Sequence, residues 1–362
     1  MKGKQNYGVY LLPLFLIGLL IVALSSFLFS CSSSSGGSSS NIVSNNLTIK
    51  TYSVGNGPSG IAIDVNGAVW VANTMNTPLG TVSEIIPSTG AILTYTVGSA
   101  PKGLVIDQAS NIWVANTNND TPYLSEIKST GTVVTYTVQD SGSYPPAIDS
   151  IAISKDGDIW GVDFDNNILF DFSHSIDKVI TTYPTEYQQP SIISLDANNH
   201  AWIGYSYSNT GVNALSEVDL ATGNTISSYT ISPHPYAIAI DQKGNVWVRC
   251  LQEAVYEISP TTGSEISYTV WTGTGNIAID SAGNVWVPNV SRLTEINLAT
   301  GSVITSATNV GNNIDGIAID KSGDIWLVNA GNNTVSEIMN IAKGPQYFPY
   351  QGPQWPTDGG YF

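Results

Sequence analysis

The chain has 362 residues, enough for one large domain or two of medium size. Its formal net charge is -16, with 28 acidic against 12 basic residues, and an acidic body repels nucleic acid and anionic lipid surfaces, which argues against both as partners. Charged residues make up only 11% of the chain, whereas Gly, Ser, Thr and Asn are abundant. This composition predicts many short strands and turns rather than helices.

The first 30 residues have the pattern of a secretory signal. Lys2 and Lys4 give a basic start, Leu11–Leu24 is almost wholly apolar, and Leu28-Phe29-Ser30-Cys31 follows. A small residue directly before a cysteine resembles the lipobox of bacterial lipoproteins, in which the chain is cut before the cysteine and the thiol is acylated; Phe29 departs from the usual small residue. The alternative is a transmembrane anchor of about 20 apolar residues.

Residues 31–46 are expected to be a linker, consisting of the lipidated Cys31 and a Ser/Gly-rich tract. With Cys31 acylated, Cys250 is the one cysteine left, so no disulfide forms within the mature chain and Cys250 is expected to be inert core. Under either reading of the N-terminus, the following domain is exported and tethered. It faces the periplasm or the cell surface, at the outer membrane if the cell has two.

From residue 55 the chain repeats itself, and seven of its nine tryptophans mark the copies at spacings of 39 to 47 residues. The marker residues are Trp70, Trp113, Trp160, Trp202, Trp247, Trp286 and Trp326. Such a period, with four short strands in each copy, is typical of a propeller. Residues 47–342 are therefore predicted to be an all-β, seven-bladed β-propeller of four-stranded antiparallel blades.

Each copy contains strands and turns with separate physical roles. Segments such as Ile61–Ile63 and Val69–Ala72 are apolar on successive residues, so both of their faces must be covered. Asp-x-x-Gly, as in Asp64–Gly67, predicts a tight hairpin. The seventh copy stops after Ile338, whereas Thr51–Val54 precedes the first copy and matches its last strand. The N-terminal strand is thus expected to close the last blade.

The repeated P-x-G-I-A-I-D-x-x-G-N-V-W-V and the later S-E-I…T-G, which cover residues 48–338, resemble the NHL and streptogramin-lyase group of propellers, the virginiamycin B lyase family most of all. The resemblance implies that two positions of each copy ring a polar channel mouth on the top face. The residues between Pro and Gly are Ser59, Lys102, Asp149, Ser191, Tyr236, Gly275 and Asp315. The residues three after each Trp are Asn73, Asn116, Asp163, Tyr205, Cys250, Asn289 and Asn329.

The lyase family uses histidine and glutamate at these two kinds of position, with magnesium, to open a macrocyclic ester by elimination. Here no His stands at the first position and no Glu at the second. His234, on a predicted top loop, is the candidate base, although a surface loop role is commoner. Asp149, Asp163 and Asp315 could also act if they meet. His174 and His200 fall in predicted bottom turns. Asp163-x-Asp165-x-Asn167 resembles the start of a calcium loop but lacks its Gly and closing Glu, which favours a plain hairpin.

Two further features complete the sequence reading. One glutamate recurs in most copies on an outer strand, where a structural or solvated role is expected. Residues 343–362 form a tail rich in proline and aromatic residues, which is either disordered, a flap on the propeller or a docking peptide.

The sequence favours a monomeric binding or scaffold module for a small molecule, glycan or protein ligand. The alternative is an enzyme: a streptogramin-lyase-like carbon–oxygen lyase, or a lactone hydrolase, with a magnesium or calcium ion at the channel mouth.

Overall fold

The computed structural model describes residues 47–75, 79–117, 124–138, 144–173, 175–176, 178–206, 214–232, 234–251, 253–273 and 275–345. The predicted signal peptide and linker, His174 and residues 346–362 of the tail lie outside these ranges. The described residues form strands and turns, and no helix suited to crossing a membrane is found among them.

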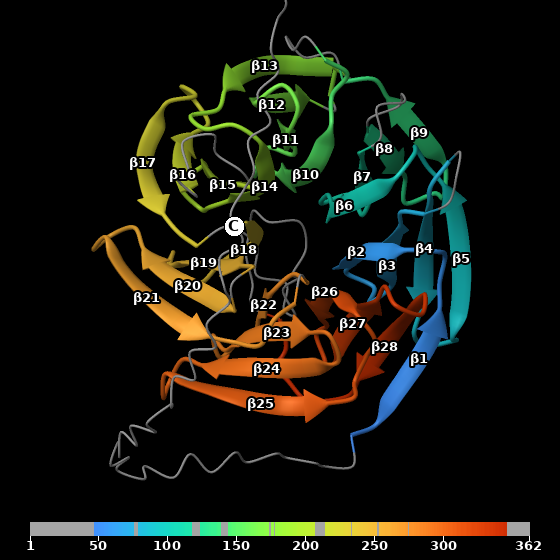
Figure 1. Ribbon diagram of the computed structural model, residues 1–362. Coiled ribbons are helices and arrows are strands. Elements are labelled where there is room, and N and C mark those ends of the chain that lie inside the picture. Colours follow the sequence, from blue (N-terminus) through green and yellow to red (C-terminus); the bar gives the residue numbers. More distant parts are fainter. Residues whose placement is uncertain are drawn as a thin grey trace, which may run out of the picture. The chain divides into compact units, whose positions relative to one another are not determined.

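Seven four-stranded antiparallel sheets make up the blades, as predicted (Figure 1). The innermost strands are β2 (Pro58–Ile63), β6 (Pro101–Ile106), β10 (Ile148–Ile153), β14 (Pro190–Leu195), β18 (Pro235–Ile240), β22 (Ala278–Ile279) and β26 (Ile314–Ile319). The second strands are β3 (Val69–Asn73), β7 (Ile112–Asn116), β11 (Ile159–Asp163), β15 (His200–Tyr205), β19 (Val246–Cys250), β23 (Val285–Asn289) and β27 (Ile325–Asn329).

The outer half of each blade consists of a third and a fourth strand. The third strands are β4 (Thr81–Ile86), β8 (Leu124–Ile127), β12 (Ile168–Ser173), β16 (Ala214–Asp219), β20 (Ala254–Ser259), β24 (Arg292–Asn297) and β28 (Thr334–Ile338). The fourth strands are β5 (Ala91–Thr96), β9 (Val133–Tyr136), β13 (Lys178–Pro184), β17 (Thr225–Thr230), β21 (Ser264–Thr269), β25 (Ser302–Thr308) and β1 (Ile49–Ser53).

The last blade is closed by the N-terminal strand, which confirms the prediction. β1 pairs antiparallel with β28, with Tyr52 opposite Val335. The Tyr52 ring stacks on Trp326 at 5.4 Å between centroids, and its hydroxyl donates a hydrogen bond of 2.7 Å to Glu337. The first and last copies of the repeat are therefore held together by backbone pairing, an aromatic stack and a buried hydrogen bond.

A carboxylate clip joins the first hairpin of six blades to the marker tryptophan. In blade one, one oxygen of Asp64 accepts the backbone N–H groups of Asn66 and Ala68, and the other accepts the Trp70 indole N–H. The indole–carboxylate bonds of the six blades are 3.1 to 3.4 Å long. The aspartates are Asp64, Asp107, Asp196, Asp241, Asp280 and Asp320.

The recurring glutamate of the third strand lies opposite the same tryptophan and has a structural role. Glu84 is paired in register with Trp70, and it accepts a 2.7 Å hydrogen bond from Tyr95 of the fourth strand. The Tyr95 ring in turn packs on Trp70. Tryptophan, carboxylates and tyrosine thus tie all four strands of a blade together and satisfy polar groups that packing has desolvated.

Blade three departs from this arrangement at both carboxylate positions. Ser154 stands where the clip aspartate would be, and Asp171 is the third-strand residue opposite Trp160. Asp171 is 8% exposed, and its Oδ1 is buried without a hydrogen-bond partner. Burial, together with the charge of Asp158, raises the pKa of Asp171 to about 6.

Deleting Ile49–Ser53 from the full chain should lower the melting temperature by roughly 10 °C or more, because blade seven loses its fourth strand and Trp326 loses its stacked ring. Deleting the same number of residues from the Ser/Gly tract, residues 36–40, is the matched control and should leave it unchanged. Circular dichroism melts compare the two chains. Equal melting temperatures would show that β1 adds no stability to the ring.

Replacing Asp171 with Asn should stabilise the protein at pH 7.5 by about 1–3 kcal/mol. The folded-state pKa of about 6 lies above the ordinary value, so the folded state holds the proton more tightly. Stability of the wild type therefore falls as pH rises from about 4 to about 6 and stays reduced above that range. Urea unfolding at pH 4 and pH 7.5 measures the difference, with the exposed Asp156→Asn as control. An advantage of the same size at both pH values would contradict the assignment.

Candidate functional site

A pocket of about 430 Å³ lies among the innermost strands of all seven blades. Its polar side chains belong to Ser59, Lys102, Asp149, Ser150, Ser191, Ser194, Ser206, Tyr236, Asn276 and Asp315. Its apolar wall is formed by Ile61, Leu104, Ile151, Ile193, Ile238, Ile277 and Ile317. Small-molecule sites are concave and mostly apolar with a few polar groups; the volume of this pocket is in their range, and its lining is about as polar as it is apolar.

The polar lining follows from a bulge repeated in six of the seven innermost strands. In β2, regular pairing with β3 is interrupted between Pro58 and Ile61, and β10 is interrupted in the same way between Ile148 and Ser150. A bulge turns an extra side chain away from the regular alternation of the strand. In these strands the displaced residue is the one that stands between Pro and Gly of the repeat, which the sequence predicted to face the channel. Six residues of this kind line the pocket. They are Ser59, Lys102, Asp149, Ser191, Tyr236 and Asp315.

The glycine of this motif lets the inner strands approach one another closely. A Cβ on Gly316 would lie 2.6 Å from the Ser59 carbonyl oxygen of the next blade, and one on Gly60 would collide with the Lys102 carbonyl. Any side chain at either position would force the inner strands apart. The narrow axis, and with it the size of the pocket, therefore depends on these two glycines.

The second predicted set, three residues after each tryptophan, does not line the pocket, and this expectation is corrected. These residues end the second strands and are buried, at 0 to 2% exposure. Several of their side chains bond to the third strand: Asn73 donates to Ser83 at 3.0 Å, and Tyr205 shares a 2.7 Å hydrogen bond with Ser216. The members are Asn73, Asn116, Asp163, Tyr205, Cys250, Asn289 and Asn329.

The charged groups at the pocket are partly balanced. Lys102 Nζ lies 3.0 Å from Asp149 Oδ2 in a half-exposed ion pair. Arg249 is buried behind the pocket, where it donates to the Gly275 carbonyl at 2.6 Å and feels the negative charge of Asp315. Burial lowers the pKa of Arg249 to about 10, which leaves it cationic at neutral pH. A ligand in the pocket would contact serine and tyrosine hydroxyls, the Asn276 amide, and the charged side chains of Lys102, Asp149 and Asp315.

Neither His234 nor the suggested calcium loop belongs to this pocket. His234 has a φ of 56° and its carbonyl accepts the Leu251 N–H, but it is not among the pocket-lining residues. Asp163 Oδ1 accepts the backbone N–H groups of Asp165 and Asn166. Its carboxylate is therefore committed to a hairpin turn. Cys250 is 1% exposed, and burial raises the pKa of its thiol to about 12, which makes it a poor nucleophile.

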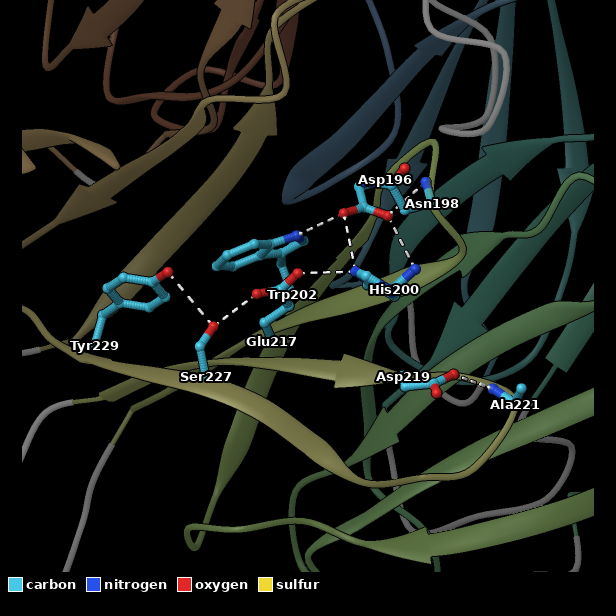
Figure 2. Close-up of polar contacts among 9 residues, drawn as sticks. All are labelled: Asp196, Asn198, His200, Trp202, Glu217, Asp219, Ala221, Ser227 and Tyr229. Carbon is cyan, nitrogen blue, oxygen red and sulfur yellow. Dashed lines mark hydrogen bonds and ion pairs between the residues drawn. The ribbon is translucent and has the colours of Figure 1, made fainter. Parts of the chain in front are cut away.

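A second cluster of reactive side chains lies in blade four and was not predicted (Figure 2). His200 Nδ1 is 2.8 Å from Glu217 Oε1 and 3.5 Å from Asp196 Oδ2. The sequence contained a sign of it: among the seven copies, only this one carries His four residues after the clip aspartate. Because Glu217 comes from another strand, its place beside that histidine follows only from the strand register.

Comparisons with known proteins support the fold. No family model matches the chain, and no curated protein matches it in sequence. Among solved structures, a streptogramin B lyase has a TM-score of 0.67 at 17% identity, covering 80% of this chain and 97% of the other. A catalytically inactive virginiamycin B lyase from Staphylococcus aureus, solved with quinupristin, has a TM-score of 0.68 at 18% identity, and the match covers 81% of this chain and 99% of the other. Hydrazine synthase from Kuenenia stuttgartiensis has a TM-score of 0.67 at 13% identity, and the match covers 80% of this chain and 97% of the other.

At these identities the likeness concerns the fold, and proteins of different activity share it. The chain therefore has the seven-bladed propeller fold seen in the streptogramin B lyase structures.

Proposed function

We propose that this protein is an exported, lipid-anchored and monomeric binding module, whose axial pocket takes a small molecule with an apolar body and several hydrogen-bonding groups. The observation that carries the proposal is the bulge repeated in six inner strands, which directs one side chain from each of these six blades into one 430 Å³ space. Varied side chains on a constant backbone suit recognition of one particular ligand.

The volume argues for a small molecule as the ligand, in preference to a glycan chain or a protein. A space of about 430 Å³ enclosed by seven strands admits a compact molecule, or one end of a larger one. Among the described residues of the lining, Tyr236 is the one with an aromatic side chain. Lys102 and Asp149 lie near enough to each other to meet an amino and a carboxyl group of one ligand.

The lyase alternative gains no support from the pocket. Elimination requires a base at the reacting carbon and a group that holds the developing oxyanion. Among the described residues that line the pocket there is no histidine, and its carboxylates are Asp149, paired with Lys102, and Asp315, near the buried Arg249. Both acids already face a cation, which favours a binding role over that of a general base.

Ligand binding can be tested by blocking the pocket. The full chain, purified in detergent, is screened by ligand-observed NMR against a library of small polar-aromatic fragments. Ser191→Trp should weaken binding of the hits at least about tenfold, because the indole fills the space among the inner strands. Ser129→Trp, the same change at an exposed turn outside the pocket, is the control and should bind as the wild type does. Hits that bind Ser191→Trp unchanged would place the ligand elsewhere, and a wild type without hits would count against a small-molecule site.

The tether is tested separately. Cys31→Ser should abolish incorporation of radioactive palmitate into the protein in growing cells, because the acylated thiol is missing, and the unmodified chain should keep its full-length mass. The unchanged Cys250 serves as the internal control for unspecific labelling. Equal labelling of mutant and wild type would exclude a lipoprotein anchor at Cys31.

A further inference from the structure

We propose that Asp196, His200 and Glu217 of blade four bind a divalent transition-metal ion, with zinc as the best-suited metal. One carboxylate oxygen of Asp196, one of Glu217 and Nδ1 of His200 lie within 4.8 Å of one another. This site is separate from the axial pocket, whose lining includes none of the three residues. It goes beyond the binding role proposed for that pocket.

The distances match those around a small tetrahedral ion. Metal–ligand bonds of 2.0–2.1 Å place neighbouring ligand atoms about 3.3–3.4 Å apart. In blade four, Nδ1 of His200 lies 2.8 Å from Glu217 Oε1 and 3.5 Å from Asp196 Oδ2. The first spacing is that of a hydrogen bond and needs to widen by about half an ångström. A bound metal ion would take the place of the proton that His200 Nδ1 and Glu217 Oε1 share.

The remaining oxygens of both carboxylates are already held in place. Asp196 Oδ1 accepts the backbone N–H groups of Asn198 and His200, each at 2.9 Å, and Glu217 Oε2 accepts the Ser227 hydroxyl at 2.6 Å (Figure 2). Such outer contacts orient metal-binding side chains. Asp196 Oδ2 also accepts the Trp202 indole N–H at 3.3 Å, so it would coordinate a metal through its remaining lone pair. Two carboxylates and one imidazole suit zinc better than magnesium or calcium, which take oxygen ligands.

Blade five shows how the same geometry is satisfied without a metal. Asn245 occupies the place of His200, and its amide nitrogen donates to Asp241 Oδ2 and to Glu257 Oε1, both at 3.1 Å. The two carboxylate oxygens therefore converge on one point in either blade. An amide nitrogen has no lone pair to offer a metal, whereas an imidazole nitrogen has one. The replacement of Asn by His at this point gives blade four a third ligand atom.

Access to the site is open on one side. The His200 side chain is 25% exposed, whereas those of Asp196 and Glu217 are 10% and 9% exposed. A metal held by the three side chains can thus keep a water molecule as its fourth ligand. Because Asp196 follows β14, His200 begins β15 and Glu217 lies on β16, a bound ion would fasten three strands of the blade together.

The test compares the wild type with His200→Asn, which recreates the arrangement of blade five. The untagged full chain is stripped with a chelator and titrated with zinc sulfate in a calorimeter. The wild type should bind one zinc per chain at micromolar concentrations and melt at a higher temperature with zinc. His200→Asn should keep the metal-free melting temperature, bind zinc at least about tenfold more weakly and show no shift with zinc.

A second variant and a second readout make the result decisive even if His200→Asn folds poorly. Glu217→Gln keeps an acceptor for Ser227 but removes one charged ligand, so zinc binding should again weaken. Cobalt added to the wild type should give the visible absorption of a four-coordinate ion, and either variant should lose it. The proposal is overturned if the wild type binds no zinc at micromolar concentrations, or if both variants bind zinc and cobalt as the wild type does.

Discussion

The hydrogen bond from the marker indole to the clip aspartate is the interaction on which six of the seven blades are organised. In blade six, Trp286 donates to Asp280 at 3.1 Å, while the other oxygen of Asp280 holds the hairpin backbone. A buried indole N–H without an acceptor would cost about 1–3 kcal/mol, and a buried carboxylate without donors would cost more. Because each group satisfies the other, a large ring can be packed between blades while the first hairpin stays fixed.

The bulge that lines the pocket is a feature separate from the clip. Six inner strands carry the bulge, among them that of blade three, which has no clip, whereas the pairing of β22 with β23 in blade six, which has the clip, shows no such bulge. The side chain at the bulge is then free to vary, since it contributes no contact to the clip. Ser59, Lys102 and Tyr236 differ in size and charge but occupy equivalent backbone positions. Structural and recognition demands are thus placed on separate residues of one repeat.

The fold could be predicted from the sequence because its signals are local and repeated. The tryptophan lattice gave the number of blades, and the match of Thr51–Val54 to Thr94–Val97 gave the closure. Of the first predicted set, six residues line the pocket and Gly275 does not. The residues three after each tryptophan do not line the pocket, although the sequence predicted that they would. A residue at the end of a strand can face either the axis or the third strand, and contacts such as that of Asn73 with Ser83, which decide between the two, are not visible in the sequence.

The blade-four cluster required knowledge of register that no local pattern supplies. Trp202 faces Glu217 across a connection whose length varies from copy to copy, so the two cannot be aligned by counting. Once the register is known, comparison among the blades becomes informative.

The seven copies act as internal controls for one another, since four kinds of residue stand four positions after the clip aspartate, or after Ser154 in blade three. These residues are Ala68, Asn111, Asp158, His200, Asn245, Asn284 and Asp324. Asn111, Asn245 and Asn284 all donate to the clip aspartate, so asparagine meets the structural need. An aspartate there adds a charge beside existing carboxylates, and in blade seven burial and neighbouring acids raise the pKa of Asp324. Neither Asp nor His is required by the fold at this position. The stability of the hairpin therefore does not explain an Asp or a His at this position. For His200, the two carboxylate oxygens that converge on its ring nitrogen offer an explanation, namely metal binding.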